Sequence, residues 1–254
     1  MNTPALTVKS LLSQANIKSK FEEILRERAN AFTANLAVMV NNNAALSRCE
    51  PMTVISAAVV AASLDLPIDP NLGFAHIVPY GDKAQFQIGF KGFIQLAMRS
   101  GQYQRIGVTE IYDGQLIEEN PLTGEYVFDF KAKKDETIIG WAAYFKTING
   151  FEKTLYWPVE KIDKHGKRFS QTYKKGFGLW KDDFNAMASK TVLKALLSKW
   201  GILSTEMQSA VRFDQSVVKS VENQEVEYID NDPISEAFDE PVKAKKVEAE
   251  KLVK

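Results

Sequence analysis

Apolar side chains recur every three or four positions in several long stretches of the chain, which is the spacing of one buried helix face. The first stretch runs from Ile17 to Val40, and an alanine-rich one follows from Thr53 to Leu64. The same spacing returns from Gly89 to Ser100 and from Asp182 to Trp200, each directly before a glycine that suits a helix end. The pattern therefore predicts helices over these four ranges.

Alternating apolar and polar positions predict strands in the middle of the chain. Two tight-turn signals, Gly81-Asp82 and Asn149-Gly150, each separate a pair of such runs and predict hairpins. The expected strands cover residues 74–79, 83–88, 105–112, 125–130, 138–146 and 151–157. Because the strands are grouped between helices, we expect an α+β fold with N-terminal helices, an antiparallel β-meander, a long C-terminal core helix and a flexible acidic tail.

Charge is distributed unevenly although the totals cancel, with 32 basic and 32 acidic residues among 254. Residues 1–130 hold 10 Lys and Arg against 13 Asp and Glu, and residues 201–254 hold 7 against 12. Residues 131–200 hold 15 against 7 and are therefore strongly basic. A basic block between acidic flanks is typical of a protein that presents one surface to a polyanion, although a solvated lysine-rich face has the same composition.

Several kinds of chemistry find no support in the sequence. Cys49 is the single cysteine, which excludes an internal disulfide, and no Gly-x-x-x-x-Gly-Lys-Ser/Thr loop is present to hold nucleotide phosphates. The two histidines, His76 and His165, are too few for a histidine-rich metal site. We therefore expect no catalytic residue, metal or cofactor. Since no apolar run is long enough to span a bilayer, we also expect no membrane contact and a cytoplasmic location.

The densest basic stretch, residues 161–181, also carries aromatic rings. Single-stranded nucleic acid suits such a combination, because cations follow the phosphates while ring faces stack on any base. The alternative is that the rings anchor the segment to the core and only the lysines meet solvent. The cations and rings of the segment are Lys161, Lys164, Lys167, Arg168, Phe169, Tyr173, Lys174, Lys175, Phe177, Trp180 and Lys181.

Two of the predicted helices place basic side chains one turn apart, opposite their apolar residues. Lys91, Gln95 and Arg99 recur every fourth residue in the first helix, and Lys190 and Lys194 do so in the second. Such rows can follow a phosphate chain, but an ordinary solvated helix face has the same pattern. Both interpretations stay open.

Three long strings carry a resemblance to a known family. They are Asp69–Tyr80 (DPNLGFAHIVPY), Gln87–Gly101 (QIGFKGFIQLAMRSG) and Trp180–Lys194 (WKDDFNAMASKTVLK). In this order they strongly resemble the RecT family of phage and prophage recombinases, over about residues 41–204. Where many members have a Leu-Pro-x-Ser turn, this chain has Trp200-Gly-Ile-Leu-Ser204, so that turn is not carried over.

The resemblance implies a protein that binds single-stranded DNA and anneals complementary strands without ATP in phage-type homologous recombination, and that is not an enzyme. It implies a homo-oligomeric ring or helical filament with a continuous basic groove for the strand and the annealed duplex. A 5′ to 3′ phage exonuclease is the implied partner, and a bacterial host the implied setting.

The resemblance, which does not cover the acidic tail, and the composition of the chain together suggest a division into three parts. Residues 1–40 are expected to form an N-terminal helical segment with oligomer contacts, and residues 41–204 a DNA-binding and annealing core. Residues 205–254 are expected to be a flexible acidic tail, which is a candidate binding segment for host single-strand-binding protein or the exonuclease.

Two other functions remain as alternatives. A metal-dependent DNA nuclease needs clustered carboxylates, whereas an acid pair such as Asp182 and Asp183 is more simply explained by a helix start. A phage structural or scaffold protein is the second alternative. For the annealing function, the expected DNA-binding residues are Lys91, Arg99, Arg105, Lys161, Lys167, Arg168, Phe169, Tyr173, Lys174, Lys175, Trp180, Lys181, Lys190 and Lys194.

Overall fold

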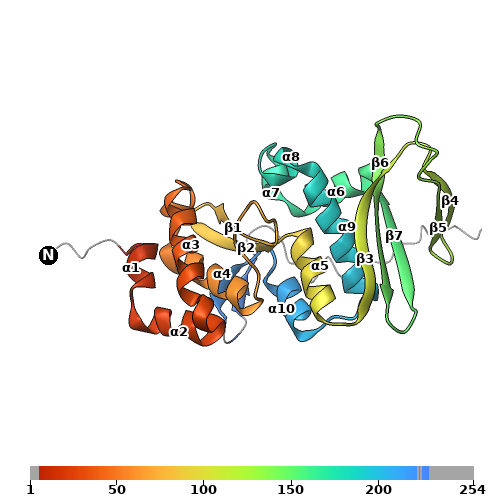
Figure 1. The fold of residues 1–254 in the computed structure, drawn as a ribbon. Helices are drawn as coiled ribbons and strands as arrows, with labels where there is room; N and C mark the ends of the chain where they lie inside the picture. Colours follow the sequence, from red (N-terminus) through yellow and green to blue (C-terminus); the bar gives the residue numbers. More distant parts are fainter. Residues whose placement is uncertain (1–5, 222, 224, 229–254) are drawn as a thin grey trace, which may run out of the picture.

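Helices and antiparallel strands follow the predicted order in the computed structural model, which describes residues 6–221, 223 and 225–228. The α+β fold with N-terminal helices is confirmed, and Figure 1 shows those helices at one end and the β4–β5 hairpin at the other. The first elements are α1 (Val8–Leu12), α2 (Ala15–Leu25), the 3₁₀ helix η1 (Arg26–Arg28), α3 (Ala29–Asn41), η2 (Leu46–Arg48), α4 (Pro51–Ser63), β1 (Ala75–Tyr80), β2 (Lys83–Ile88) and α5 (Phe90–Arg99). They are followed by β3 (Tyr103–Tyr112), β4 (Leu116–Asn120), β5 (Glu125–Phe128), β6 (Ile138–Thr147), β7 (Glu152–Pro158), α6 (Val159–Phe169), α7 (Gln171–Lys174), α8 (Leu179–Asp182), α9 (Phe184–Trp200), α10 (Thr205–Phe213), β8 (Val217–Ser220) and β9 (Glu225–Glu227).

The helix predicted over residues 17–40 is two helices with a sharp break at Arg26. Arg26 has a φ of 52°, which no α-helix tolerates, and α2 ends before it. A continuous helix would hold Phe21 and Phe32 about 16 Å apart along its axis. The break brings the two ring centroids to 5.8 Å and lets α2 pack on both α3 and the buried helix α4. Tertiary packing therefore overrides the local pattern here.

Both predicted hairpins are present. Gly81, with a φ of 61°, forms the turn between β1 and β2, in which Tyr80 lies opposite Lys83. Gly150, with a φ of 90°, has the same role between β6 and β7. Glycine suits both positions because it accepts a positive φ without steric cost.

The main sheet has β6 between β3 and β7, with antiparallel pairing on both sides. Trp141, Ala143 and Phe145 of β6 are buried in the main core, which also holds the apolar residues of α9. The opposite face of the sheet is covered by the β4–β5 hairpin, whose Tyr126 and Phe128 pack there. The sheet is thus sandwiched between α9 and this hairpin.

Strand β4 is missing from the prediction. Glu118 and Glu119 interrupt the alternation on which the prediction rests, and a register shift between Leu116 and Glu118 displaces the pairing with β5. The predicted run of strands is therefore a sheet plus a separate hairpin.

The boundary predicted at residue 205 for the flexible tail is wrong. Residues 205–213 form α10, whose Met207 and Phe213 are buried, and β8 follows with Val217 and Val218 buried as well. The acidic composition of residues 201–254 as a whole concealed an apolar face in α10 that completes the core. The rest of the predicted tail, from residue 229 onward, lies outside the described residues.

Candidate nucleic-acid interface

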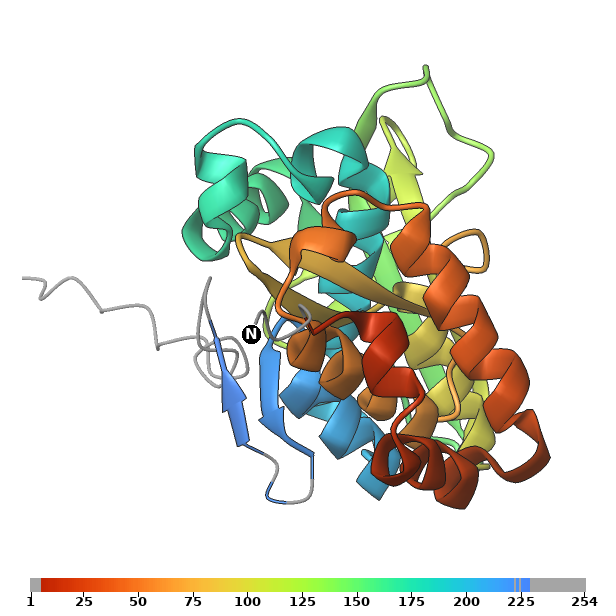
Figure 2. The same cartoon turned by 90° about the vertical axis from the view of Figure 1, so that its left-hand side faces the viewer.

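The basic segment at residues 159–182 folds into α6, α7 and α8, which we call the cap. The cap lies over the N-terminal end of α9 (Figures 1 and 2). Gly176 and Gly178, with φ of 80° and 88°, occupy the reversal between α7 and α8. The glycine-punctuated stretch of the sequence is therefore a folded unit and not an extended loop.

A chain of aromatic contacts fixes the cap to the sheet. Trp180 is 7% exposed and stacks on Tyr173, with ring centroids 5.6 Å apart. Trp180 also meets Phe184 edge-on at 5.8 Å, and Phe184 meets Trp141 at 5.7 Å. Packing within the protein already occupies the ring of Trp180, so the structure does not present it to a DNA base.

The other two predicted rings of the cap are half-buried. The Tyr173 hydroxyl donates to Asp163 at 2.7 Å, and burial, reinforced by this carboxylate, raises the pKa of Tyr173 to about 12. Phe169 lies against His165, with ring centroids 4.7 Å apart, and beneath the guanidinium of Arg168 at 4.9 Å. Both rings hold the cap together as they stand, which matches the anchoring alternative.

Gly166 of α6 allows this anchoring. A Cβ at this position would lie 2.9 Å from a ring atom of Trp180. We expect Gly166→Ala to lower the free energy of unfolding by about 1–3 kcal/mol, which is typical of overpacking, as measured by urea unfolding. Gly107→Ala is the matched control, because its Cβ would meet nothing within 4 Å. Equal stability of the two variants would contradict the proposed role of Gly166.

The cations of the cap face outward. Lys167 pairs with Asp163 at 2.8 Å, and the Lys161 ammonium lies 4.2 Å from the ring centroid of Trp157. Phe177 is 54% exposed, although it is not among the predicted DNA-binding residues. The cap therefore presents a positive surface with one open ring. Its exposed basic residues are Lys161, Lys164, Lys167, Arg168, Lys174, Lys175 and Lys181.

Beside the cap lies a cavity of about 440 Å³ to which all three strings contribute. Residues 70–79 line it from β1 and the preceding loop, residues 87–91 from β2 and α5, and residues 183–190 from α9. Leu179 of the cap lines it as well and is 42% exposed. The sequence resemblance thus maps to one place in the fold.

Lys91 lies at the exposed rim of this cavity. It belongs to the first turn of α5, which carries no acidic residue and whose N-cap, Gly89, makes no side-chain capping bond. The positive end of the helix dipole and the Lys91 ammonium therefore reinforce each other. His76 lines the same cavity, and burial together with the nearby Lys190 lowers its pKa, so that it is neutral at pH 7.

Lys190 and Lys194 do not form a solvent-facing row. They are 5% and 7% exposed, and their ammonium groups lie 2.7 and 3.1 Å from the two oxygens of the buried Asp214. The segment after α10 covers this face of α9, so the structure does not present these two lysines to solvent, where DNA would lie. Asp214 also accepts from the Ile88 N–H at 3.1 Å, so the group joins α9, β2 and the C-terminal segment.

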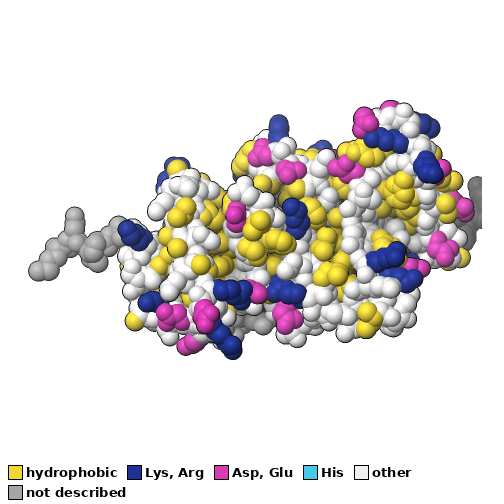
Figure 3. Space-filling view, in the orientation of Figure 1, with side chains coloured by type: hydrophobic (Ala, Val, Ile, Leu, Met, Phe, Trp, Pro, Cys, Tyr) yellow, Lys and Arg dark blue, Asp and Glu magenta, His cyan; other side chains and the backbone are white. Residues whose placement is uncertain are grey.

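Arg99 and Arg105 lie apart from the cap. The Arg99 guanidinium donates to the Leu64 carbonyl at 2.8 Å and lies 3.6 Å from Asp65. Figure 3 shows basic and acidic side chains next to one another along the lower part of the molecule, between the positions of α2 and α5 in Figure 1. Arg105 is exposed on β3, opposite Lys146, at the end of the sheet that is remote from the cap. The structure thus brings together the cap cations and Lys91, but not these two arginines.

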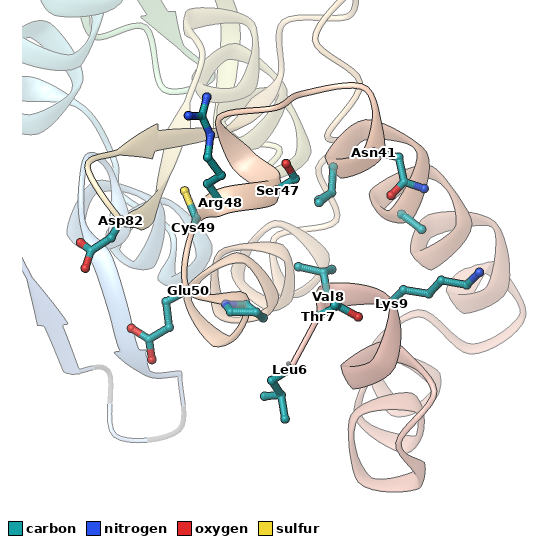
Figure 4. Close-up of a pocket in the computed structure, with 13 residues that line it drawn as sticks. Leu6, Thr7, Val8, Lys9, Asn41, Ser47, Arg48, Cys49, Glu50 and Asp82 are labelled. Carbon is teal, nitrogen blue, oxygen red and sulfur yellow. The ribbon is translucent and has the colours of Figure 1, made fainter. Parts of the chain in front are cut away.

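A second cavity, of about 520 Å³, lies beneath α1 (Figure 4). It is lined by residues of α1, α3 and η2 together with Asp82, and no residue of the three strings is among its described lining. Burial, with a smaller contribution from Asp82, raises the pKa of the Cys49 thiol in its wall. None of its described lining residues belongs to the cap.

The predicted structural role of the paired acids is seen at Asp183, whose carboxylate accepts from the Ala186 N–H at 3.0 Å and caps α9. In the described part of the chain, no three His, Cys, Asp or Glu side chains are grouped as metal ligands. Among the helices that the structure describes, none combines the length and apolarity needed to cross a bilayer.

Exposed cations clustered on one face are typical of proteins that bind nucleic-acid backbones. Comparison with known families matches residues 30–230 to the RecT family. An uncharacterized protein of Bacillus subtilis (strain 168), YqaK, is 56% identical over 205 residues, which cover 81% of this chain and 71% of that protein. Protein RecT of Escherichia coli (strain K12) is 27% identical over 191 residues, or 67% of this chain and 65% of that protein.

The chain therefore belongs to the RecT family. Membership gives it a role in phage-type recombination and strand annealing, with DNA binding and self-assembly as family properties. The family match confirms the resemblance that the three strings carry.

Proposed function

We propose that the protein binds single-stranded DNA on the cap and at the mouth of the adjoining cavity, and that it anneals complementary strands without nucleotide hydrolysis. The observation that carries this proposal is the outward-facing set of seven cations on the cap, next to the cavity that unites the three strings. Phosphates lie along these cations, and Lys91 with the N-terminus of α5 takes one at the cavity mouth. Phe177 offers a ring face to a base.

The proposed annealing reaction requires mainly electrostatic screening from the protein. Base pairing of complementary strands is favourable by itself, so the protein needs only to reduce the repulsion between two polyanions and hold one with its bases accessible. Self-assembly extends the surface, because caps of neighbouring subunits then form a continuous groove. An annealing protein of this kind performs no covalent step.

Partners follow from the same proposal. A 5′ to 3′ phage exonuclease supplies the single strand, and the acidic residues from 229 onward are the proposed docking segment for it or for host single-strand-binding protein. These residues lie outside the described part of the chain, so this proposal rests on their composition.

An annealing assay tests the function. Two complementary labelled oligonucleotides should pair many times faster with the protein than without it, in the absence of nucleotide. The logarithm of the affinity for one strand should fall linearly with the logarithm of salt concentration, with a slope of about −0.7 for each phosphate contacted.

Three outcomes would contradict the proposal. Affinity that hardly changes with salt would exclude the electrostatic mechanism. Cleavage of the oligonucleotides on addition of magnesium or manganese would favour a nuclease. Assembly of the same size with and without oligonucleotide, and without annealing, would favour a scaffold protein. A non-complementary pair of strands is the control.

A further inference from the structure

An exposed tryptophan lies at the end of α9 that is remote from the cap. Trp200 is the last residue of α9 and is 42% exposed, whereas Trp141, Trp157 and Trp180 are 1%, 6% and 7% exposed. Helix α9 has 17 residues, which places Trp200 about 24 Å from the cap end of the helix. Trp200 is therefore not part of the cap surface.

Two lysines from different elements flank the indole. The Lys199 ammonium lies 5.6 Å and that of Lys153, on β7, 5.2 Å from its ring centroid. Lys153 also donates to the carbonyl of Thr123 at 2.9 Å, so the β4–β5 turn fixes its position. Lys199 is exposed and lies one residue from the ring on the same helix. Both ammonium groups lie over the ring, so a base stacks on the indole when an ammonium moves aside and pairs with the phosphate of the same nucleotide.

We propose that Trp200, Lys153 and Lys199 form a second nucleic-acid contact, which takes the incoming complementary strand. This proposal rests on the proposed function, in which the cap and the adjoining cavity hold the first strand. Annealing brings two polyanions together, and a second set of cations, separated from the first by the length of α9, lets each strand keep its own counter-charge. The positive charges beside the ring favour a nucleic acid over an apolar protein partner.

Intrinsic fluorescence provides a direct readout of this contact, because Trp200 is the most exposed of the four tryptophans. The full-length protein is first saturated with a labelled oligodeoxythymidine and then mixed with oligodeoxyadenosine. We expect most of the quenching upon addition of the second strand. Trp200→Ala should slow capture of that strand at least fivefold, since a base stack is lost, and should leave the affinity for the first strand within twofold. Trp200→Phe should restore most of the rate.

Matched controls separate this contact from general effects of surface substitution. Val127→Ala removes an apolar side chain that is 50% exposed on β5, and Lys131→Ala removes an exposed lysine between β5 and β6. Both controls should anneal at the wild-type rate.

Several results would overturn the proposal. Quenching that is complete with the first strand would place Trp200 in the first-strand site. If Trp200→Ala changed the assembly size in light scattering but captured the second strand as fast as the wild type, Trp200 would be a contact between protein subunits. A wild-type protein that binds no first strand would overturn the proposed function and this contact with it. If the wild type binds the first strand and Trp200→Ala anneals as fast as the wild type, only the proposed second contact is contradicted and the proposed function is not.

Discussion

Asp214→Ala is expected to lower the free energy of unfolding by about 3–5 kcal/mol. The carboxylate is fully buried, and the ammonium groups of Lys190 and Lys194 lie 2.7 and 3.1 Å from its oxygens. The substitution leaves both ammonium groups in the interior without this negative charge. Because domains are stable by only about 5–15 kcal/mol, a large part of the total is lost. Urea unfolding followed by circular dichroism measures the effect.

A triple variant keeps this prediction testable if Asp214→Ala does not fold. Lys190→Met and Lys194→Met remove the two charges, and Asp214→Asn keeps an oxygen that can accept from the Ile88 N–H. We expect the triple variant to regain stability to within about 2 kcal/mol of the wild type, because replacing a whole buried ion group by uncharged side chains leaves no unpaired charge in the interior. An Asp214→Ala protein with the wild-type unfolding midpoint would show that the ion group contributes little.

The same carboxylate makes stability depend on pH. Burial by itself would raise the pKa of Asp214, but the attraction of Lys190 and Lys194 outweighs it, and the pKa is lowered. A lowered folded-state pKa contributes stability above the unfolded-state value, near 3.9, and this contribution is lost as pH falls through the folded-state pKa. Wild-type stability should therefore fall below about pH 4, and that of the triple variant should fall less.

The double variant Lys174→Glu/Lys175→Glu is expected to bind single-stranded DNA more than tenfold more weakly at about 0.1 M salt. Both lysines are exposed on the cap, and loss of two phosphate contacts should also reduce the magnitude of the salt slope by about 1.4. Because neither side chain is buried, the unfolding curve should not change. Fluorescence anisotropy of a labelled oligonucleotide at several salt concentrations measures both quantities.

The control for this variant changes the net charge equally. Lys9→Glu/Lys18→Glu alters two exposed lysines of α1 and α2, which lie at the left end of the molecule in Figure 1, away from the cap. It should bind DNA within about threefold of the wild type, since distant exposed charges are screened. Equal weakening by both double variants would mean that overall charge, and not the cap, governs the affinity.

The parts of the fold that depend on local sequence could be predicted. The helices and the two hairpins follow from residue spacing and from glycine at the turns, and Gly81 and Gly150 have the expected positive φ. The break at Arg26 could not be predicted in this way, because it follows from a contact between Phe21 and Phe32 that only the folded chain makes. The spacing of apolar residues describes each helix separately, whereas a break such as that at Arg26 depends on the helices packed around it.

The residue types of the candidate site could be predicted from the sequence, but which of these side chains are exposed to solvent could not. The sequence identifies the basic stretch at residues 161–181, yet it does not show that Trp180 is packed between Tyr173 and Phe184. It also places Lys190 and Lys194 on one helix face without revealing that Asp214 covers them, because that acid comes from a stretch with the composition of a tail. The signal for Trp200 is a basic neighbour, Lys199, but its second cation, Lys153, is distant in sequence.

After α9 the chain packs back into the core, and this determines where a shortened protein can end and still fold. A protein ending at residue 204 would lack Phe213, Asp214 and the β8 strand, and its interior would be open to solvent. One ending at residue 228 would retain these and the pair between Lys83 and Glu227 at 2.9 Å. The junction should therefore lie after Tyr228 in domain swaps between relatives and in deletions of the residues from 229 onward.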